Sequence, residues 1–211
     1  GLCITKELEK LIHKPVYLEN DANLAALAEA IIGEGKEYNI VQYLTVSTGL
    51  GAGLVINKKV FQGAHGFANE VANVCLWNNG PSHGSIYPGG VEAICSWTAI
   101  EQRAEKAGLI VANAGEVNDL ALKGNLEAQK IMDDAKLYLA NFISGIQAFI
   151  DPEIVILGGS VALKIPGFVE EVESLVKTKV YPVVEPLVKV RKSTLNEDSG
   201  LLGAACLAFN S

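Results

Sequence analysis

The sequence has no hydrophobic run long enough to span a membrane and no dense cluster of positive charge. A spanning helix needs roughly 18 or more consecutive apolar residues, and no stretch of this chain approaches that length. Its 17 basic residues are outnumbered by 24 acidic ones and are scattered, except for the short run KVRK at 189–192. Because nucleic-acid binding depends on a concentrated basic surface, we expect neither a membrane segment nor a nucleic-acid partner.

Cysteine is scarce, and its spacing argues against two common uses. Cys3, Cys75, Cys95 and Cys206 lie far apart in the sequence and form no Cys-x-x-Cys pair. This spacing indicates neither a disulfide framework nor a structural zinc site. The opening GLCITKELEK carries acidic charge and lacks the layout of a signal peptide. These absences predict a protein of the reducing cytoplasm.

The composition is sufficient for a large core, since 49% of the 211 residues are hydrophobic. A hairpin is predicted within 51–63, with its turn at Asn57 and Lys58. Apolar patterning elsewhere predicts helices over 22–32, 91–106, 126–149, 166–178 and 200–209, and strands over 14–18, 40–48, 153–159 and 186–190. Hairpins combined with strand-helix alternation predict an α/β fold with a mixed sheet flanked by helices.

Three polar residues, Glu19, Asn20 and Asp21, stand between the strand-like run 14–18 and the predicted helix that begins at Ala22. In α/β folds, ligands collect at the carboxyl ends of strands, so such a corner is typical of a functional site. Asp21 is also a residue type that caps helices through the free N–H groups of the first turn. These residues alone leave both explanations open.

Two glycine-rich segments follow strand-like runs. The first, STGLGAG at 47–53, joins two strands, so it is neither a dinucleotide-binding turn nor a P-loop, both of which lead into a helix. Its backbone N–H groups and the hydroxyls of Ser47 and Thr48 suit a phosphate, although an ordinary tight hairpin explains the glycines equally well. The second segment, Gly158 and Gly159, would let a flat ligand or a helix lie against the backbone.

Taken together, six segments resemble the ROK family of sugar kinases and sugar-responsive repressors, which belongs to the actin-like and hexokinase-like superfamily with its ribonuclease H-like lobes. They occur in family order over nearly the whole chain: ENDAN at 19–23, TVSTGLGAG at 45–53, FQGAHGFANE at 61–70, GGVEAICS at 89–96, DPEIVILGGSVA at 151–162 and SGLLGAACLA at 199–208. The resemblance implies an actin-like or hexokinase-like lobe, and at the corner it favours function over capping.

The resemblance also implies roles for particular residues on the sugar side. Asp21 would be the general base that takes the proton from a sugar hydroxyl, since a hydroxyl is a poor nucleophile until a carboxylate accepts its proton. Asn20 would hydrogen-bond neighbouring hydroxyls. Glu70 and Glu92 match the family's sugar-binding glutamates. The substrate class implied is a hexose or N-acetylhexosamine, phosphorylated at its 6-hydroxyl.

On the nucleotide side, the resemblance implies ATP and Mg²⁺ as cofactors. The loop containing Thr48, Gly49 and Gly51 would hold the terminal phosphates, and Gly158 and Gly159 would lie beside the adenosine. The family resemblance further implies a homodimer.

The sequence departs from the family pattern at its zinc motif and in the neighbouring loop. Asn69 and Ala72 replace family glycines, so we expect the loop that carries Glu70 to be shaped differently. The positions of the family's four zinc ligands are occupied by Asn73, His83, Ser85 and Gly90. A closed tetrahedral site needs four ligands, so we expect no structural zinc.

A second departure concerns domain organisation. The family's Asp-Gly-Gly-Thr phosphate loop does not occur in the sequence. We therefore expect residues 1–22 to be a remnant of an N-terminal lobe and residues 23–211 to form the C-terminal ATP- and sugar-binding lobe, with the final helix packing back on the N-terminal lobe. Such a chain would be inactive alone. Besides a kinase, a repressor's sugar-sensing lobe and a non-catalytic interaction domain stay open.

Overall fold

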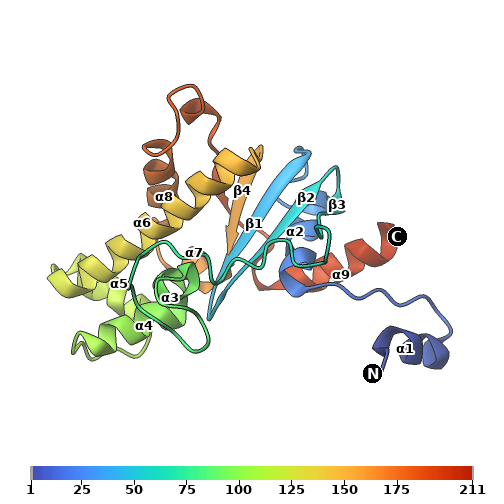
Figure 1. The fold of residues 1–211 in the computed structure, drawn as a ribbon, viewed down its shortest axis with the longest axis horizontal. Helices are drawn as coiled ribbons and strands as arrows, with labels where there is room; N and C mark the ends of the chain where they lie inside the picture. Colours follow the sequence, from blue (N-terminus) through green and yellow to red (C-terminus); the bar gives the residue numbers. More distant parts are fainter. Residues whose placement is uncertain (1, 211) are drawn as a thin grey trace.

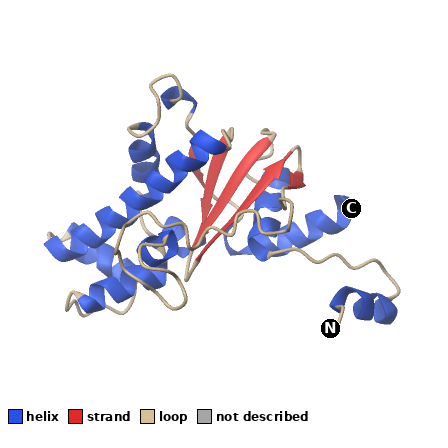
Figure 2. Cartoon of the chain, viewed as in Figure 1, coloured by secondary structure: helices blue, strands red, loops and turns tan. Residues whose placement is uncertain are grey.

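A five-stranded mixed sheet lies between two layers of helices in the computed structural model, which describes residues 2–210 (Figures 1 and 2). The strand order is β3-β2-β1-β4-β5. The first three strands form an antiparallel meander, while β4 and β5 continue the sheet in parallel with β1. The strands are β1 (Ile40–Val46), β2 (Leu50–Ile56), β3 (Lys59–Val60), β4 (Ile154–Gly158) and β5 (Val190–Lys192). The predicted α/β class with a mixed sheet is confirmed.

Alternation along the strands gives each face of the sheet its own core. On β1, Val41 and Tyr43 pack on one side, and Leu44 and Val46 pack on the other. The first side is covered by α2 (Asp21–Ile32) and α9 (Ser199–Asn210). The second is covered by α3 (Val91–Cys95), α4 (Trp97–Lys106), α5 (Ala114–Leu122), α6 (Leu126–Phe149), α7 (Gly159–Lys164) and α8 (Phe168–Lys177).

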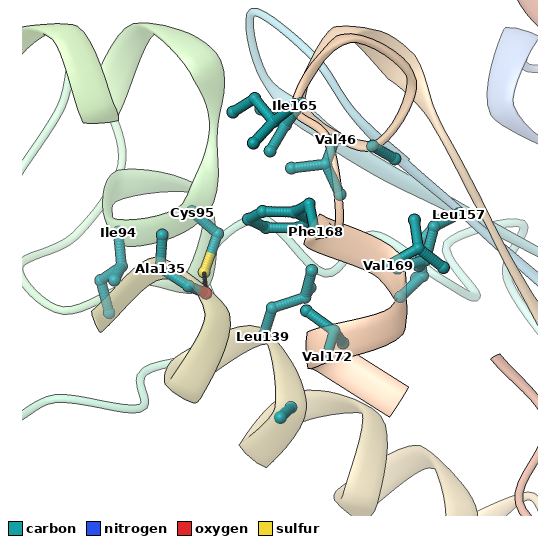
Figure 3. Packing of buried hydrophobic residues seen from close by; sticks show 14 of the residues in the cluster. Val46, Ile94, Cys95, Ala135, Leu139, Leu157, Ile165, Phe168, Val169 and Val172 are labelled. Atoms are coloured by element: carbon teal, nitrogen blue, oxygen red, sulfur yellow. Dashed lines mark hydrogen bonds between the residues drawn. The ribbon is translucent and has the colours of Figure 1, made fainter. Parts of the chain in front are cut away.

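Phe168 at the start of α8 fills the centre of the larger core (Figure 3). Around it lie Cys95 of α3 and Leu139 of α6, both fully buried. The Cys95 thiol donates a hydrogen bond to the Ala135 carbonyl at 3.3 Å, which ties α3 to α6. Truncating such a buried aromatic ring to alanine costs about 3–5 kcal/mol, so this core holds the short helix α3 in place.

Helix α2 approaches the sheet closely at glycine positions of β2. A Cβ atom at Gly53 would lie 2.7 Å from the Cβ atom of Ala26 and 2.8 Å from the carbonyl oxygen of Ala22. On the opposite side of α2, a Cβ atom at Gly203 of α9 would lie 1.9 Å from the Leu24 carbonyl oxygen. Glycine at these positions therefore allows α2 to be clamped between the sheet and α9.

The predicted helix over 91–106 is interrupted at Ser96. Ser96 has an extended backbone conformation, with φ −68° and ψ 157°, and its hydroxyl accepts the N–H of Ala99 to cap α4. The N–H of Trp97 donates to the carbonyl oxygen of Ser47 at 2.7 Å. The interruption therefore attaches the start of α4 to the first glycine loop.

Three other sequence predictions need correction. Helices α5 and α7 were not predicted. The last strand is at Val190–Lys192 rather than 186–190, because the 3-10 turn η1 (Glu185–Leu187) occupies that segment. No strand forms at 14–18, because this segment has no regular secondary structure and pairs with no described strand.

The first helix, α1 (Ile4–Ile12), stands apart from the sheet and its helices (Figure 1). No residue within Ile4–Ile12 is buried, and Leu11 is 75% exposed.

The 3-10 turn η2 (Asn196–Asp198) leads into α9 at the other end of the chain. Among residues 2–210, no helix is both long enough and apolar enough to cross a bilayer.

Candidate active site

The N-cap residue of α2 is Asn20 and not Asp21. The side-chain oxygen of Asn20 accepts the N–H groups of Ala22 at 2.8 Å and Asn23 at 3.3 Å. Asp21 is the first residue of the helix and is exposed, although one of its carboxylate oxygens also accepts the Ala22 N–H. The carboxylate therefore stays open to solvent at the corner.

Glu19 and Asn23 organise this corner, although the sequence alone gave no role to either residue. Glu19 accepts hydrogen bonds from the side-chain amides of Asn23 at 2.9 Å and Gln62 at 2.6 Å, and so joins the corner to the segment after β3. The Oδ1 atom of Asn23 is buried and has no hydrogen-bond partner among residues 2–210. Buried acceptors are normally paired, so a bound water or hydroxyl would satisfy this atom.

The two glycine segments meet at the carboxyl ends of β1 and β4, where they border a cavity of about 480 Å³. Ser47 and Thr48 line it from one side and Gly159 and Ser160 from the other, and the Ser47 and Ser160 hydroxyl oxygens are 3.3 Å apart. Lys164 also lines the cavity and lies 3.5 Å from the carboxylate of Glu197. Topology rather than local sequence brings Ser160 and Lys164 to this cavity, so sequence reasoning missed both.

Close contacts require glycine at both positions of the second segment. Gly159 has φ +81°, and a Cβ atom there would lie 2.6 Å from the Val46 carbonyl oxygen. A Cβ atom at Gly158 would lie 2.2 Å from the Tyr43 hydroxyl. Gly159 therefore lines the cavity, while Gly158 accommodates Tyr43.

Close contacts also explain the glycines of the first segment. A Cβ atom at Gly49 would lie 2.8 Å from a carboxylate oxygen of Glu92. The same Glu92 oxygen accepts the backbone N–H of Leu50 at 2.7 Å. Gly51 lies within β2 rather than in the loop, and a Cβ atom there would lie 3.2 Å from the Cβ atom of Ala22 in α2. The structure therefore places Gly49 beside Glu92 and Gly51 at the helix-sheet contact.

Glu70 and Glu92 lie near the two ends of one long loop. Glu70 is exposed and Glu92 is half-buried. The preceding residue, Asn69, has φ +68° and accepts a hydrogen bond from the side-chain amide of Gln42 at 3.2 Å. Asparagine tolerates this left-handed conformation, which otherwise favours glycine. Asn69 thus takes a glycine-like conformation just before Glu70.

The positions equivalent to zinc ligands make other contacts in this loop. The Asn73 side-chain oxygen accepts the backbone N–H of Tyr87 at 2.8 Å, and the Nδ1 atom of His83 lies 3.1 Å from the Gln102 side-chain oxygen. Ser85 is exposed, whereas Gly90 is buried. Within residues 2–210, no group of three or more His, Cys, Asp or Glu side chains is arranged to hold a metal ion.

Two titratable groups near this end of the sheet layer are buried, namely Tyr43 of β1 and Glu29 of α2. Burial raises the pKa of Tyr43, opposed by a hydrogen bond with Ser199, and the negative charges of Glu29 and Asp21 raise it further. Burial also raises the pKa of Glu29, opposed by the hydrogen bond that the Ser193 hydroxyl donates to it. The negative charge of Asp21 therefore contributes to the raised pKa of Tyr43, and Tyr43 lines the cavity.

The mixed sheet, its helical layers and the glycine segments at one sheet edge define an actin-like α/β lobe, a fold shared with solved ROK hexokinases. The ROK family model matches residues 2–211, so the chain belongs to the ROK family. An N-acetylmannosamine kinase from Yersinia pestis is 36% identical over 200 residues, which are 93% of this chain and 66% of that protein. The chain thus spans about two thirds of the length of this relative.

Solved structures give the same family. A ROK hexokinase from Thermus thermophilus has a TM-score of 0.89 and 33% identity, over 98% of this chain and 69% of that one. A ROK family glucokinase from Streptomyces griseus, solved with glucose and AMPPNP, has a TM-score of 0.79 and 25% identity, over 98% and 72%. A ROK family transcriptional regulator shares the fold, with a TM-score of 0.83 and 22% identity over 98% and 55%. Sugar kinases are therefore prominent among the relatives.

Proposed function

We propose that this chain is the larger lobe of an ATP-dependent sugar kinase, which transfers the γ-phosphoryl group of MgATP to the 6-hydroxyl of a hexose or N-acetylhexosamine. The observation that carries the proposal is the exposed Asp21 carboxylate, because Asn20 provides the cap of the same helix. A sugar sensor needs only sugar contacts, whereas a kinase needs a base beside the phosphate site. The kinase relatives support this proposal.

Four residues contact the sugar in this proposal, and each has a separate role. Asp21 accepts the proton of the attacking hydroxyl. Asn20 uses its Oδ1 atom in the cap, which leaves its Nδ2 group to donate to a neighbouring hydroxyl. Glu92 uses Oε2 on the Leu50 N–H, which leaves Oε1 for the sugar, and Glu70 supplies a second carboxylate.

The cavity at the ends of β1 and β4 holds the nucleotide. The loop of Thr48 and Gly49 faces the terminal phosphates, and Gly51 continues this loop into β2. Gly159 lies beside the adenosine, and Gly158 packs on Tyr43 next to it. The Ser47 and Ser160 hydroxyls, 3.3 Å apart, are additional donors to phosphate oxygens. Mg²⁺, bound together with the nucleotide, would neutralise the charge that develops on the phosphates during phosphoryl transfer.

We also propose a division of the chain into parts of two lobes. Residues 1–22 belong with an N-terminal lobe, and residues 23–211 are the ATP- and sugar-binding lobe, with α9 packing back on the N-terminal lobe. The exposed apolar side chains of α1 support this division, since such a helix is stable when its apolar face is covered. The intact protein is a cytoplasmic homodimer without structural zinc, and the 211 residues alone are inactive.

A coupled assay of ADP release tests the proposal on the intact protein and on residues 1–211 alone. The sugar panel contains glucose, mannose, N-acetylglucosamine and N-acetylmannosamine, each with MgATP. We expect turnover of at least one sugar by the intact protein and none by the shorter chain. Sugar binding without ADP release would instead assign the protein to the sugar-sensing class, and equal turnover by both chains would reject the two-lobe division.

A further inference from the structure

The loop over 71–90 is closed at its base by backbone hydrogen bonds. The N–H of Glu92 donates to the Ala72 carbonyl at 3.2 Å, and the N–H of Val91 donates to the Val74 carbonyl at 2.9 Å. One step further into the loop, the Leu76 N–H donates to the Gly89 carbonyl at 2.9 Å. This short ladder connects the segment after Glu70 to Glu92 itself.

An aromatic residue of this loop attaches it to the helical layer. The ring of Trp77 stacks on Tyr138 of α6, with 5.1 Å between ring centroids and 6° between ring planes. The guanidinium carbon of Arg103 lies 5.8 Å from the centroid of the Trp77 ring. Both arrangements are favourable for an indole ring, through aromatic stacking and cation–π attraction.

The arginine in this contact is itself fixed. Arg103 of α4 forms a salt bridge with Asp134 of α6 at 2.5 Å, and both side chains are largely buried. Its other terminal nitrogen donates to the carbonyl oxygens of Ile94 at 3.3 Å and Ile131 at 3.4 Å. Trp77 is therefore held against groups that cannot move without disturbing α3, α4 and α6.

The loop is also folded tightly around Trp77. The N–H of Gly80 donates to the Trp77 carbonyl at 2.9 Å. A Cβ atom at Gly89 would lie 1.8 Å from that carbonyl oxygen, and one at Gly80 would lie 2.8 Å from the indole Cγ atom. Two glycines thus allow both arms of the loop to pass beside this one residue.

We propose that Trp77 is a positioning residue for the sugar site: its stacking on Tyr138 and its contact with Arg103 fix the loop ladder that sets Glu70 relative to Glu92. The inference rests on the proposed sugar-binding roles of those glutamates. A misplacement of about 1 Å at a binding group lowers activity as much as a hundredfold.

The test compares Trp77→Ala and Trp77→Phe with Phe142→Ala in the intact protein. Phe142 is buried in α6 at 8% exposure, so its truncation provides a control for general loss of packing. We expect Trp77→Ala to weaken sugar binding between about tenfold and a hundredfold, measured by calorimetry without nucleotide. The KM for MgATP should change less than about twofold, and Trp77→Phe, which keeps a ring for stacking, should recover most of the affinity.

Hydrogen exchange provides a readout that depends on neither sugar nor turnover. Trp77→Ala should speed exchange at the ladder amides of Leu76, Val91 and Glu92 by about tenfold or more, whereas Phe142→Ala should not do so selectively. Unchanged ladder exchange in Trp77→Ala, or an equal sugar-affinity loss in Phe142→Ala, would overturn the inference. If the intact protein binds sugar without releasing ADP, the kinase proposal is refuted. The sugar affinities of the Trp77 and Phe142 variants still test the positioning role of Trp77 in that case.

Discussion

A carboxylate oxygen of Glu92 accepts the backbone N–H of Leu50 at 2.7 Å. This hydrogen bond joins a proposed sugar-binding residue to the end of the glycine loop between β1 and β2, which is the proposed phosphate loop. In the sequence these two residues belong to separate motifs. Their hydrogen bond means that a change at Glu92 affects the β1–β2 connection directly, and not only a sugar contact.

Replacing Glu92 by alanine should therefore impair both substrates. The Leu50 N–H would lose its acceptor, which costs about 1–3 kcal/mol of folding stability when the site stays dry. We expect increased KM values for both sugar and MgATP, measured by steady-state kinetics, and a lower melting temperature. Glu92→Gln keeps an acceptor oxygen and should retain the stability. A Glu92→Ala protein with wild-type KM for MgATP would show that the hydrogen bond has no effect on the phosphate loop.

Asp21→Asn should abolish catalysis while sparing sugar affinity. The amide has the shape of the carboxylate but cannot accept the hydroxyl proton, so kcat should decrease by about 10² to 10⁴. Calorimetry should give a sugar Kd close to the wild-type value. Asn20→Ala is the matched comparison, since it removes the helix cap and should cost about 1 kcal/mol of stability. Near-normal turnover in Asp21→Asn would exclude Asp21 as the base.

The intact protein should contain no stoichiometric zinc. The Asn73 side chain accepts the Tyr87 N–H in the loop where zinc ligands would stand, so metal removal has nothing to disturb. We expect elemental analysis to find less than about one tenth of an equivalent of zinc, and a chelator to leave the melting temperature unchanged. One tightly held zinc ion per chain would show that the loop has a different ligand set.

Folding stability should depend on pH through Glu29. This carboxyl is fully buried at 0% exposure, and burial raises its pKa above the ordinary value of 4.5. The folded protein therefore keeps the proton at pH values where the unfolded chain has lost it. The stability that this group contributes is fully present below pH 4.5 and is lost as the pH increases through the folded-state pKa.

Glu29→Gln resembles the protonated form and should remove this pH dependence. Urea unfolding from pH 4 to pH 8, with the variant compared with the wild type, measures the effect. The stability of the wild type relative to the variant should decrease as the pH increases. A difference that stays constant over the whole range would indicate that Glu29 has the same pKa in the folded and unfolded chains.

The elements that the sequence predicted well are those specified by nearby residues. The predicted helix over 126–149 is observed as α6 at Leu126–Phe149, where the Asn125 side chain caps its first turn. The turn predicted at Asn57 and Lys58 is formed with positive φ at both residues. Both features depend on a few consecutive side chains, and these are visible in the sequence.

The features that the sequence did not predict depend on partners far along the chain. The interruption at Ser96 places the Trp97 N–H on the Ser47 carbonyl, and Ser160 meets Ser47 only because β4 pairs with β1. The choice between Asn20 and Asp21 as the cap depends on side-chain orientation. The motif resemblance suggested the candidate residues, while their contacts became evident only from the tertiary structure.

The parallel pairing of β1 with β4 has a consequence for how the protein folds. Val41 pairs with Ile154, so the β1–β2 hairpin and helices α3 to α6 lie in the chain between the two paired residues. Contacts between residues distant in sequence form late, because the entropy of closing the intervening chain opposes them. We therefore expect the cavity between the ends of these two strands to be among the last features to assemble during folding. A nucleotide bound there would recognise only chains whose central sheet is complete.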